Sequence, residues 1–242
     1  MATSCDACPL RGLPAFSPLS EEELRFMRRF KSGELTVEPG ATILMEGSRA
    51  PQIHTALRGM GLRYKTLASG RRQVINFVFP GDFIGLQAGV MGEMQHSVEA
   101  TTRMTLCVFQ RKDLWGFFRA NAERAFDLTW LAAVEEHFLG EALATVGQRT
   151  AVERISWALV RIHQRGEALG LMDGAGMRLP YRQQDLADAL GLSLVHTNKT
   201  LAKLRARQLA SWDGGRLRIP DIAALAEVAD MELEAPEIRP LI

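Results

Sequence analysis

The sequence of 242 residues contains few cysteines and no long apolar run. Its three cysteines are an odd number, which argues against a framework of disulfide bonds and leaves free thiols, metal ligands or redox groups as their roles. A membrane-spanning helix needs about twenty apolar residues in a row, and no stretch approaches that length. The first residues also lack the basic patch and apolar core of a signal peptide. We therefore expect a cytoplasmic protein without a membrane partner.

The motifs that mark common classes of enzyme are missing as well. There is no G-x-S-x-G nucleophile elbow, no H-E-x-x-H zinc motif and no glycine-rich phosphate loop. The five histidines are scattered without the spacing of a metal site. The sequence therefore predicts a protein that is not an enzyme.

Charge is distributed unevenly, although the formal net charge of the chain is only +1. Residues 147–219 contain 12 Lys or Arg and 6 Asp or Glu, which is a net charge of +6. The rest of the chain contains 17 Lys or Arg and 22 Asp or Glu, which is a net charge of −5. A basic segment of this kind attracts polyanions. We therefore expect a polyanionic partner for the C-terminal half.

The N-terminal half has the pattern of an all-β domain that follows a short helix. Ser20 and Glu23 form a capping box, which opens a helix ending near Phe30. Short apolar runs then fill residues 35–110 and alternate with turn signals, which predicts a jelly roll, barrel or sandwich. Within this region, residues 83–100 predict a short helix and a return strand. The turn signals are Pro39-Gly40, Glu46-Gly47, Arg58-Gly59, Ser69-Gly70 and Pro80-Gly81.

Residues 121–146 lack proline and carry apolar side chains at helical spacing, which predicts one long helix. One face of this helix is expected to pack on the β domain, and its remaining apolar width favours pairing with a second copy across a two-fold axis. A long core helix of a monomer is the alternative. The stripe comprises Leu131, Val134, Phe138, Ala142 and Thr145, widened by Phe126, Trp130 and Ala133.

Two helical segments separated by Gly191 form the most informative motif, RQQDLADALGLSLVHTNKTLAKLRARQLA. Ala187 is small enough for close contact between the helices, Gly191 permits a positive φ at the turn, and Ser193 can cap the second helix. The next residues, ASWDGGRLRIP, predict a hairpin with its turn at residues 213–215. Together these segments predict a winged helix-turn-helix.

A pair of helices packed in an ordinary core is the alternative interpretation of this motif. However, the second helix carries polar and basic residues that are rarely buried, and the net charge of its surroundings suits a phosphate backbone. Thr197 and Thr200 depart from the pattern, because apolar residues are usual at those inward positions. The polar and basic residues are His196, Asn198, Lys199, Lys203, Arg205 and Arg207.

This order of parts, with PGDFIG at residues 80–85, resembles the CRP/FNR superfamily of bacterial transcription regulators. The resemblance implies an α+β fold with a jelly-roll, cyclic-nucleotide-binding-like sensor domain at 1–120, a dimerisation helix at 121–146 and a winged helix-turn-helix domain at 147–242, hinged near Gly147. It implies a homodimer that binds double-stranded DNA in response to a redox, oxygen or small-molecule signal, with RNA polymerase as a further partner. A signalling adaptor that has this sensor domain but binds no DNA is the rival, and the basic winged helix argues against it.

The residues that bind cyclic nucleotides in this superfamily are not matched. Its cyclic-nucleotide binders follow PGDFIG with a Glu for the ribose and later use an Arg-Ser pair for the cyclic phosphate. Here Leu86 follows the motif, and His96 precedes Ser97. Leu86 cannot accept a hydroxyl proton, and a neutral His96 is a poor substitute for a guanidinium fork. We therefore expect that cAMP is not a ligand, and haem ligated by His96 is an alternative for this region.

In the recognition helix, the base-reading positions of the superfamily fall on Val195, Asn198 and Lys199. Both well-known branches place Glu at the first position, whereas Val195 has no acceptor for cytosine, so we expect a different half-site. Asn198 suits adenine, Lys199 suits guanine or a phosphate, and His196 suits either role. The residues predicted to contact DNA are Ser193, Val195, His196, Asn198, Lys199, Lys203 and Arg205.

Cys5 and Cys8 in CDACPLR, with Cys107 in TLCVF, resemble three of the four ligands that hold an oxygen-sensitive four-iron, four-sulfur cluster in the fumarate and nitrate reduction regulator branch. The missing ligand position falls near Pro14, which cannot ligate. One iron would then need water, glutathione or Asp6, unless the iron–sulfur cluster has three irons. A reversible disulfide between Cys5 and Cys8, and three inert thiols, are the alternatives.

Overall fold

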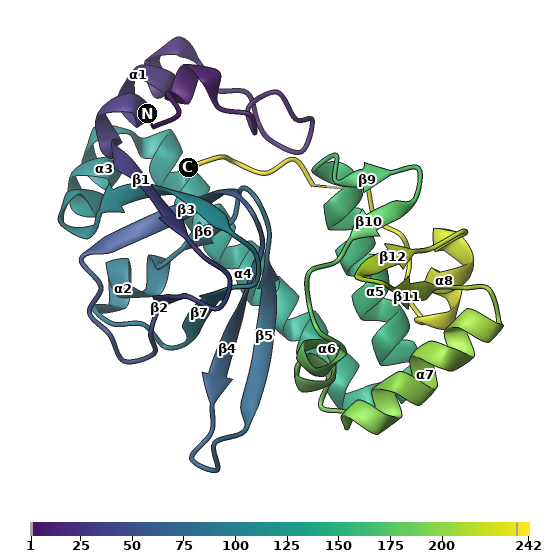
Figure 1. The fold of residues 1–242 in the computed structure, drawn as a ribbon. Helices are drawn as coiled ribbons and strands as arrows, with labels where there is room; N and C mark the ends of the chain where they lie inside the picture. Colours follow the sequence, from purple (N-terminus) through teal and green to yellow (C-terminus); the bar gives the residue numbers. More distant parts are fainter. Residues whose placement is uncertain (1, 236) are drawn as a thin grey trace. The chain divides into compact units, whose positions relative to one another are not determined.

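The computed structural model describes residues 2–235 and 237–242, and the chain divides into two units. The first unit comprises the residues up to Glu136 together with Ile238–Ile242, and the second comprises His137–Glu237. Helix α4 (Ala122–Gln148) runs from the first unit into the second, so the boundary falls within one continuous helix (Figure 1). Among the described residues, no helix has the length and apolar character that crossing a membrane requires.

The strands of the first unit form two antiparallel four-stranded sheets (Figure 1). One sheet has the order β1-β8-β3-β6 and the other has the order β2-β7-β4-β5. Neighbours far apart in sequence, such as the first and last strands, are typical of a jelly roll, and the predicted β-roll is confirmed. The strands are β1 (Lys31–Val37), β2 (Thr42–Leu44), β3 (Gln52–Arg58), β4 (Gly61–Thr66), β5 (Arg72–Val78), β6 (Phe83–Ile84), β7 (Ser97–Ala100) and β8 (Met104–Gln110).

Short helices accompany the two sheets. Helix α1 (Glu21–Phe30) begins at the predicted capping box, in which the Glu23 amide donates to Ser20 Oγ at 3.2 Å and the Ser20 amide donates to the Glu23 carboxylate at 2.7 Å. The predicted helix between the later strands is α2. The remaining helical elements are η1 (Cys5–Ala7), α2 (Leu86–Met91), η2 (Arg111–Asp113) and α3 (Leu114–Ala120).

The apolar core of the first unit has two parts. One part contains fully buried side chains from both sheets, among them Val98 and Leu106. The other joins α1, α3 and α4 to strands β3 and β8, with the Phe30 and Phe109 ring centroids 4.8 Å apart. Ile242 belongs to this second part, so the last residues of the chain are built into the β-roll.

The second unit carries the predicted winged helix-turn-helix. Helix α4 continues through Gly147, and α5 begins after a capping box between Thr150 and Glu153, so the break between these helices falls at Arg149 and Thr150. A hairpin formed by β9 and β10 extends the wing into a sheet of order β11-β12-β10-β9. The elements are α5 (Ala151–Ala168), β9 (Met172–Asp173), β10 (Gly176–Arg178), α6 (Gln183–Leu190), α7 (Leu194–Ala206), β11 (Ser211–Asp213), β12 (Arg216–Arg218) and α8 (Ile222–Val228).

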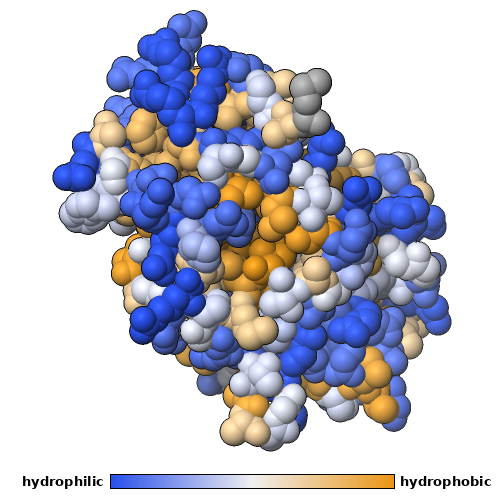
Figure 2. All heavy atoms as spheres, turned by 60° about the vertical axis from the view of Figure 1, so that its left-hand side comes forward, coloured by the Kyte–Doolittle hydropathy of each residue, from blue (hydrophilic) through white to orange (hydrophobic). Residues whose placement is uncertain are grey.

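The apolar side chains predicted to form one stripe on α4 pack in different units. Leu131 is buried in the first unit, and Phe138 stacks on Trp157 within the second, with ring centroids 5.9 Å apart. The neighbouring side chains Leu139 and Leu143 are 46% and 74% exposed. A group of apolar side chains also interrupts the mostly hydrophilic face drawn in Figure 2. Apolar side chains that gather on a surface are typical of interaction sites.

Candidate nucleic-acid interface and cysteine pocket

The turn between α6 and α7 has the geometry that its sequence predicts. Gly191 adopts a left-handed conformation with φ of 65°, and its amide donates to the carbonyl of Ala187, which is fully buried. Ser193 precedes α7, where its hydroxyl accepts a hydrogen bond from the His196 amide at 3.2 Å. The two helices are thus joined by a tight turn that fixes the orientation of α7.

Helix α7 presents its predicted DNA-contacting residues to solvent. Val195 is 64% exposed, and Leu194 beside it is 39% exposed. Thr197 and Thr200 are buried to 0% and 1% exposure, so they face inward as predicted. The exposed residues are Ser193, Val195, His196, Asn198, Lys199, Lys203 and Arg205. Their contact with DNA stays a prediction.

The wing follows directly from α7. Gly214 and Gly215 both have positive φ, 58° and 71°, which the favoured two-residue hairpin turn requires. Arg205 Nη1 lies 3.2 Å from Asp213 Oδ1, an exposed ion pair that joins the end of α7 to strand β11. Arg205 is therefore held toward the wing, unlike the residues in the first turns of α7.

Two exposed arginines near this surface were not singled out by the sequence analysis. Arg178 in β10 lies opposite Arg216 in β12, and Arg216 is paired with Asp173 at 2.8 Å. Arg182 stands at the start of α6 and is 69% exposed, although it also bonds Asp185. Arg182 could have been predicted from the sequence, because it directly precedes the first helix of the motif. The position of Arg178 could not, because it lies in a hairpin that the sequence analysis did not predict. Both add positive charge to the DNA-binding unit.

Ser97, at a usual cyclic-nucleotide position, and Arg63, whose charge acts on His96, both have other partners. Arg63 is 8% exposed, donates to the Phe83 carbonyl at 2.9 Å and pairs with Glu135 at 2.8 Å. Burial, followed by the nearby charge of Arg63, lowers the pKa of His96 to about 4, so this imidazole is neutral at pH 7. Ser97 accepts a hydrogen bond from the Glu46 amide at 3.0 Å. This arrangement agrees with the expectation that His96 is no substitute for a guanidinium.

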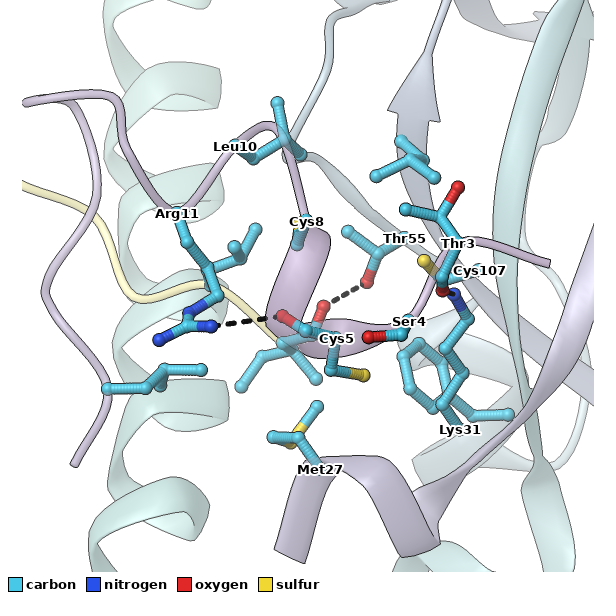
Figure 3. Close-up of a pocket in the computed structure, with 15 residues that line it drawn as sticks. Thr3, Ser4, Cys5, Cys8, Leu10, Arg11, Met27, Lys31, Thr55 and Cys107 are labelled. Atoms are coloured by element: carbon cyan, nitrogen blue, oxygen red, sulfur yellow. Dashed lines mark hydrogen bonds between the residues drawn. The ribbon is translucent and has the colours of Figure 1, made fainter. Parts of the chain in front are cut away.

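The three cysteines, which are distant in sequence, line one pocket of the first unit (Figure 3). Cys5 lies in η1, Cys8 follows it, and Cys107 lies in β8. All three are free thiols, and the cavity beside them has a volume of about 40 Å³. Within residues 2–235 and 237–242, no three His, Cys, Asp or Glu side chains are arranged to hold a metal ion. The thiols are therefore brought together without being set as ligands.

Burial makes Cys5 and Cys107 poor nucleophiles. It raises the pKa of Cys107 to about 11, and it raises the pKa of Cys5 as well. The Lys31 ammonium is the largest opposing influence on both pKa values, but it donates to the Thr3 carbonyl at 2.6 Å and to Glu34 at 2.7 Å. Cys5 and Cys107 are therefore protonated at neutral pH, and a metal would have to displace their protons.

A β-roll followed by a long helix and a winged helix-turn-helix is the architecture of a DNA-binding regulator. Residues 34–121 match the cyclic nucleotide-binding domain, and residues 153–228 match the Crp-like helix-turn-helix domain. The chain belongs to the CRP/FNR family of transcription regulators, on its FNR-like side. It is a DNA-binding regulator and not an enzyme, as the sequence predicts.

Individual relatives cover most of the chain. The nitrogen fixation regulation protein FixK of Rhizobium meliloti is 34% identical over 75% of this chain and 79% of its own length. The transcriptional activator protein FnrL of Cereibacter sphaeroides is 26% identical over 93% of this chain and 91% of its own. The structure of FixK2 from Bradyrhizobium japonicum superposes with a TM-score of 0.74 at 25% identity, over 84% of this chain and 98% of that one.

Proposed function

We propose that this regulator acts as a homodimer, which reads a palindromic DNA site with two copies of α7 and senses a signal at the cysteine pocket of the β-roll. One observation carries the DNA part: the predicted contact residues are exposed together on α7, while Thr197 and Thr200 anchor its other face. Asn198 and Lys199 would read bases, and Lys203 would hold phosphate. A regulator that acts on bacterial DNA would work in the cytoplasm.

A titration of fluorescent duplexes at several salt concentrations tests the DNA part. We expect the full-length protein to prefer one palindromic duplex over scrambled DNA, with an affinity that falls steeply with salt because Lys and Arg displace counterions from phosphate. Equal binding of all duplexes would remove the claim of sequence specificity. No binding at low salt would instead favour the signalling adaptor.

An iron–sulfur cluster is the cofactor that the chemistry of the pocket favours. Three thiol groups converge there, and thiolates are the ordinary ligands of such clusters. By its chemistry the donor set suits a cluster that Cys5, Cys8 and Cys107 would hold and that a non-protein ligand or Asp6 would complete, but the three thiols would have to move into a ligand arrangement first. When bound, the cluster would supply sensitivity to oxygen. A disulfide switch is less favoured, because the raised pKa of Cys5 suppresses the thiolate that exchange requires.

Anaerobic purification of the wild type and of Cys107→Ser tests this cofactor. We expect iron and acid-labile sulfide at cluster stoichiometry in the wild type, lost in air and absent from the variant. A colourless wild-type protein that binds DNA equally with and without oxygen would contradict the cluster and would indicate that the thiols are inert.

Dimer formation and contact with RNA polymerase complete the proposal. Phe126, Leu139 and Leu143 are exposed apolar side chains of α4, which suits pairing with a second copy. FnrL is called a transcriptional activator, and activation by this chain would require contact with RNA polymerase. Transcription in vitro from a promoter that carries the selected palindrome tests that contact.

A further inference from the structure

Helix α7 carries an apolar side chain in the middle of its exposed face. The side chains that anchor this helix are Thr197, Thr200 and Leu204, which are at most 1% exposed. Successive residues of a helix are turned by about 100°, so the direction opposite to this buried group falls on Val195. Val195 is 64% exposed, which agrees with that direction. It therefore points away from the core of the second unit.

The residues around Val195 are those predicted to contact DNA. Asn198 and Lys199 follow it by three and four residues, so all three lie on one face of α7. Leu194 lies beside Val195 at the start of the helix and is 39% exposed. The face that α7 offers to DNA thus begins with two apolar side chains and continues with an amide and an ammonium group.

Binding to DNA would bury Val195 against a base pair. It is the second residue of α7, and the N-terminal residues of a recognition helix contact the base edges in the major groove. Those edges carry hydrogen-bond donors and acceptors, and their one apolar group is the C5-methyl group of thymine. A valine side chain has no donor or acceptor, so it would leave a covered amino or carbonyl group of a G·C pair without a partner. The thymine methyl group is therefore the part of a base edge that suits contact with Val195.

We propose that Val195 is a specificity-determining residue, which contacts the C5-methyl group of one thymine in each half-site. This inference rests on the proposed function, because it requires α7 to enter the major groove. Asn198 suits adenine through a bidentate contact of its amide. Val195 and Asn198 together would select half-sites with A·T pairs at both positions.

The first turn of α7 is held firmly enough to select one position. Ser193 caps the helix by accepting a hydrogen bond from the His196 amide, which fixes the backbone on either side of Val195. A β-branched valine in a helix has one strongly preferred rotamer, so the contact costs it little conformational freedom. A short side chain in a fixed position reaches one base pair and not its neighbours. We therefore expect sensitivity to one thymine per half-site rather than to A·T content.

Deoxyuridine is the probe, because it differs from thymidine in its base only by lacking the C5-methyl group. Each thymine of the palindrome selected by the full-length protein is replaced in turn, in both half-sites, and the affinity is measured by fluorescence anisotropy. We expect one replacement to weaken binding of the wild type by about fourfold per half-site, the change in Kd that corresponds to one buried methyl group. Val195→Ala should reduce that effect to less than about twofold, because most of the apolar contact is removed.

A second variant tests the same contact by changing its chemistry. Val195→Glu introduces a carboxylate, which accepts a hydrogen bond from the amino group of cytosine. We expect this variant to prefer cytosine over thymine at the same position by about tenfold, the reverse of the wild-type preference. Val90→Ala is the matched control, since Val90 in α2 is 66% exposed but lies in the first unit, and it should keep the response to deoxyuridine.

The outcomes separate this contact from the DNA binding on which it depends. The inference is overturned if no deoxyuridine weakens binding, if the sensitivity is unchanged in Val195→Ala, or if Val195→Glu still prefers thymine. If the wild type binds the palindrome and scrambled DNA alike, the proposed function itself fails, and that comparison precedes the use of deoxyuridine. Both variants keep the core of the second unit intact, because Val195 is exposed.

Discussion

At the scale of single residues, the buried charge of Asp82 depends on its partner. Its carboxylate accepts from the Phe79 amide at 2.9 Å and pairs with Arg239 at 3.0 Å. We expect Arg239→Gln to lower the free energy of unfolding by about 3 kcal/mol, because an uncompensated buried charge remains. Adding Asp82→Asn should recover part of that loss in urea denaturation. Additive losses would contradict the assigned pairing.

Asn198 and Lys203 provide a second contrast between single residues. Both are exposed on α7, but an amide can read adenine, whereas an ammonium binds phosphate in any sequence. We expect Asn198→Ala to reduce discrimination at one base pair by about 1–3 kcal/mol, and Lys203→Ala to weaken all duplexes alike. Competition titrations against a set of single-base variants measure both effects. If Asn198→Ala weakened every duplex equally, it would have no reading role.

The sequence allowed the residues of α7 to be predicted because helix periodicity alone decides which side chains face outward. Ser193, Val195 and Asn198 are exposed, and Thr197 is buried, as the pattern indicates. The burial of Ile242 was not predictable, because it depends on a contact with Thr55 in β3, 187 residues away in sequence. Local patterns carry no information about such a contact.

At the scale of elements, the turn between α6 and α7 depends on one glycine. Gly191 has φ of 65°, a conformation that costs other residues about 1–2 kcal/mol, although a Cβ there would meet only Val146 at 3.6 Å. We therefore expect Gly191→Ala to lower the free energy of unfolding by about 1 kcal/mol. Gly140→Ala in α4 is the control, and it should raise that free energy by about 0.5–1 kcal/mol, because this glycine lies inside a helix in open space. Calorimetric unfolding of both variants measures the two signs, and a gain for Gly191→Ala would contradict the assigned turn.

Elements with strong local signals were predictable, and weaker ones were not. These signals were the capping box before α1, the Ser193 cap before α7 and the glycine turn of the wing. Hairpin β9–β10 escaped prediction, because strands of two and three residues show no alternation. The sequence also did not show which apolar residues of α4 stay exposed. The predicted stripe included Phe138, and this side chain packs on Trp157.

At the scale of the whole molecule, histidines whose pKa is lowered by desolvation make stability depend on pH, and the shift is large for His54 and His96. Burial lowers the pKa of His54 and of His96 from 6.5 to about 4. Between those values the unfolded chain binds protons that the folded chain does not, so stability is complete above about pH 6.5 and is lost as the pH falls toward 4. We expect a slope of up to about 1.4 kcal/mol per pH unit for each histidine in urea unfolding. His96→Gln should reduce this slope, and an unchanged slope would contradict the role of His96.

Assembly is the remaining property at this scale, and it depends on the exposed face of α4. Burying one leucine contributes about 1.5–3 kcal/mol, and a two-fold dimer would bury Leu143 twice. We therefore expect Leu143→Asp to raise the dimer dissociation constant by at least about a hundredfold in sedimentation equilibrium, since about 3 kcal/mol is lost. It should also weaken binding to a full palindrome far more than binding to a half-site. Leu67→Asp is the matched control, because Leu67 is 50% exposed but lies outside the helix, and a dimer that resists Leu143→Asp would have to form through another surface.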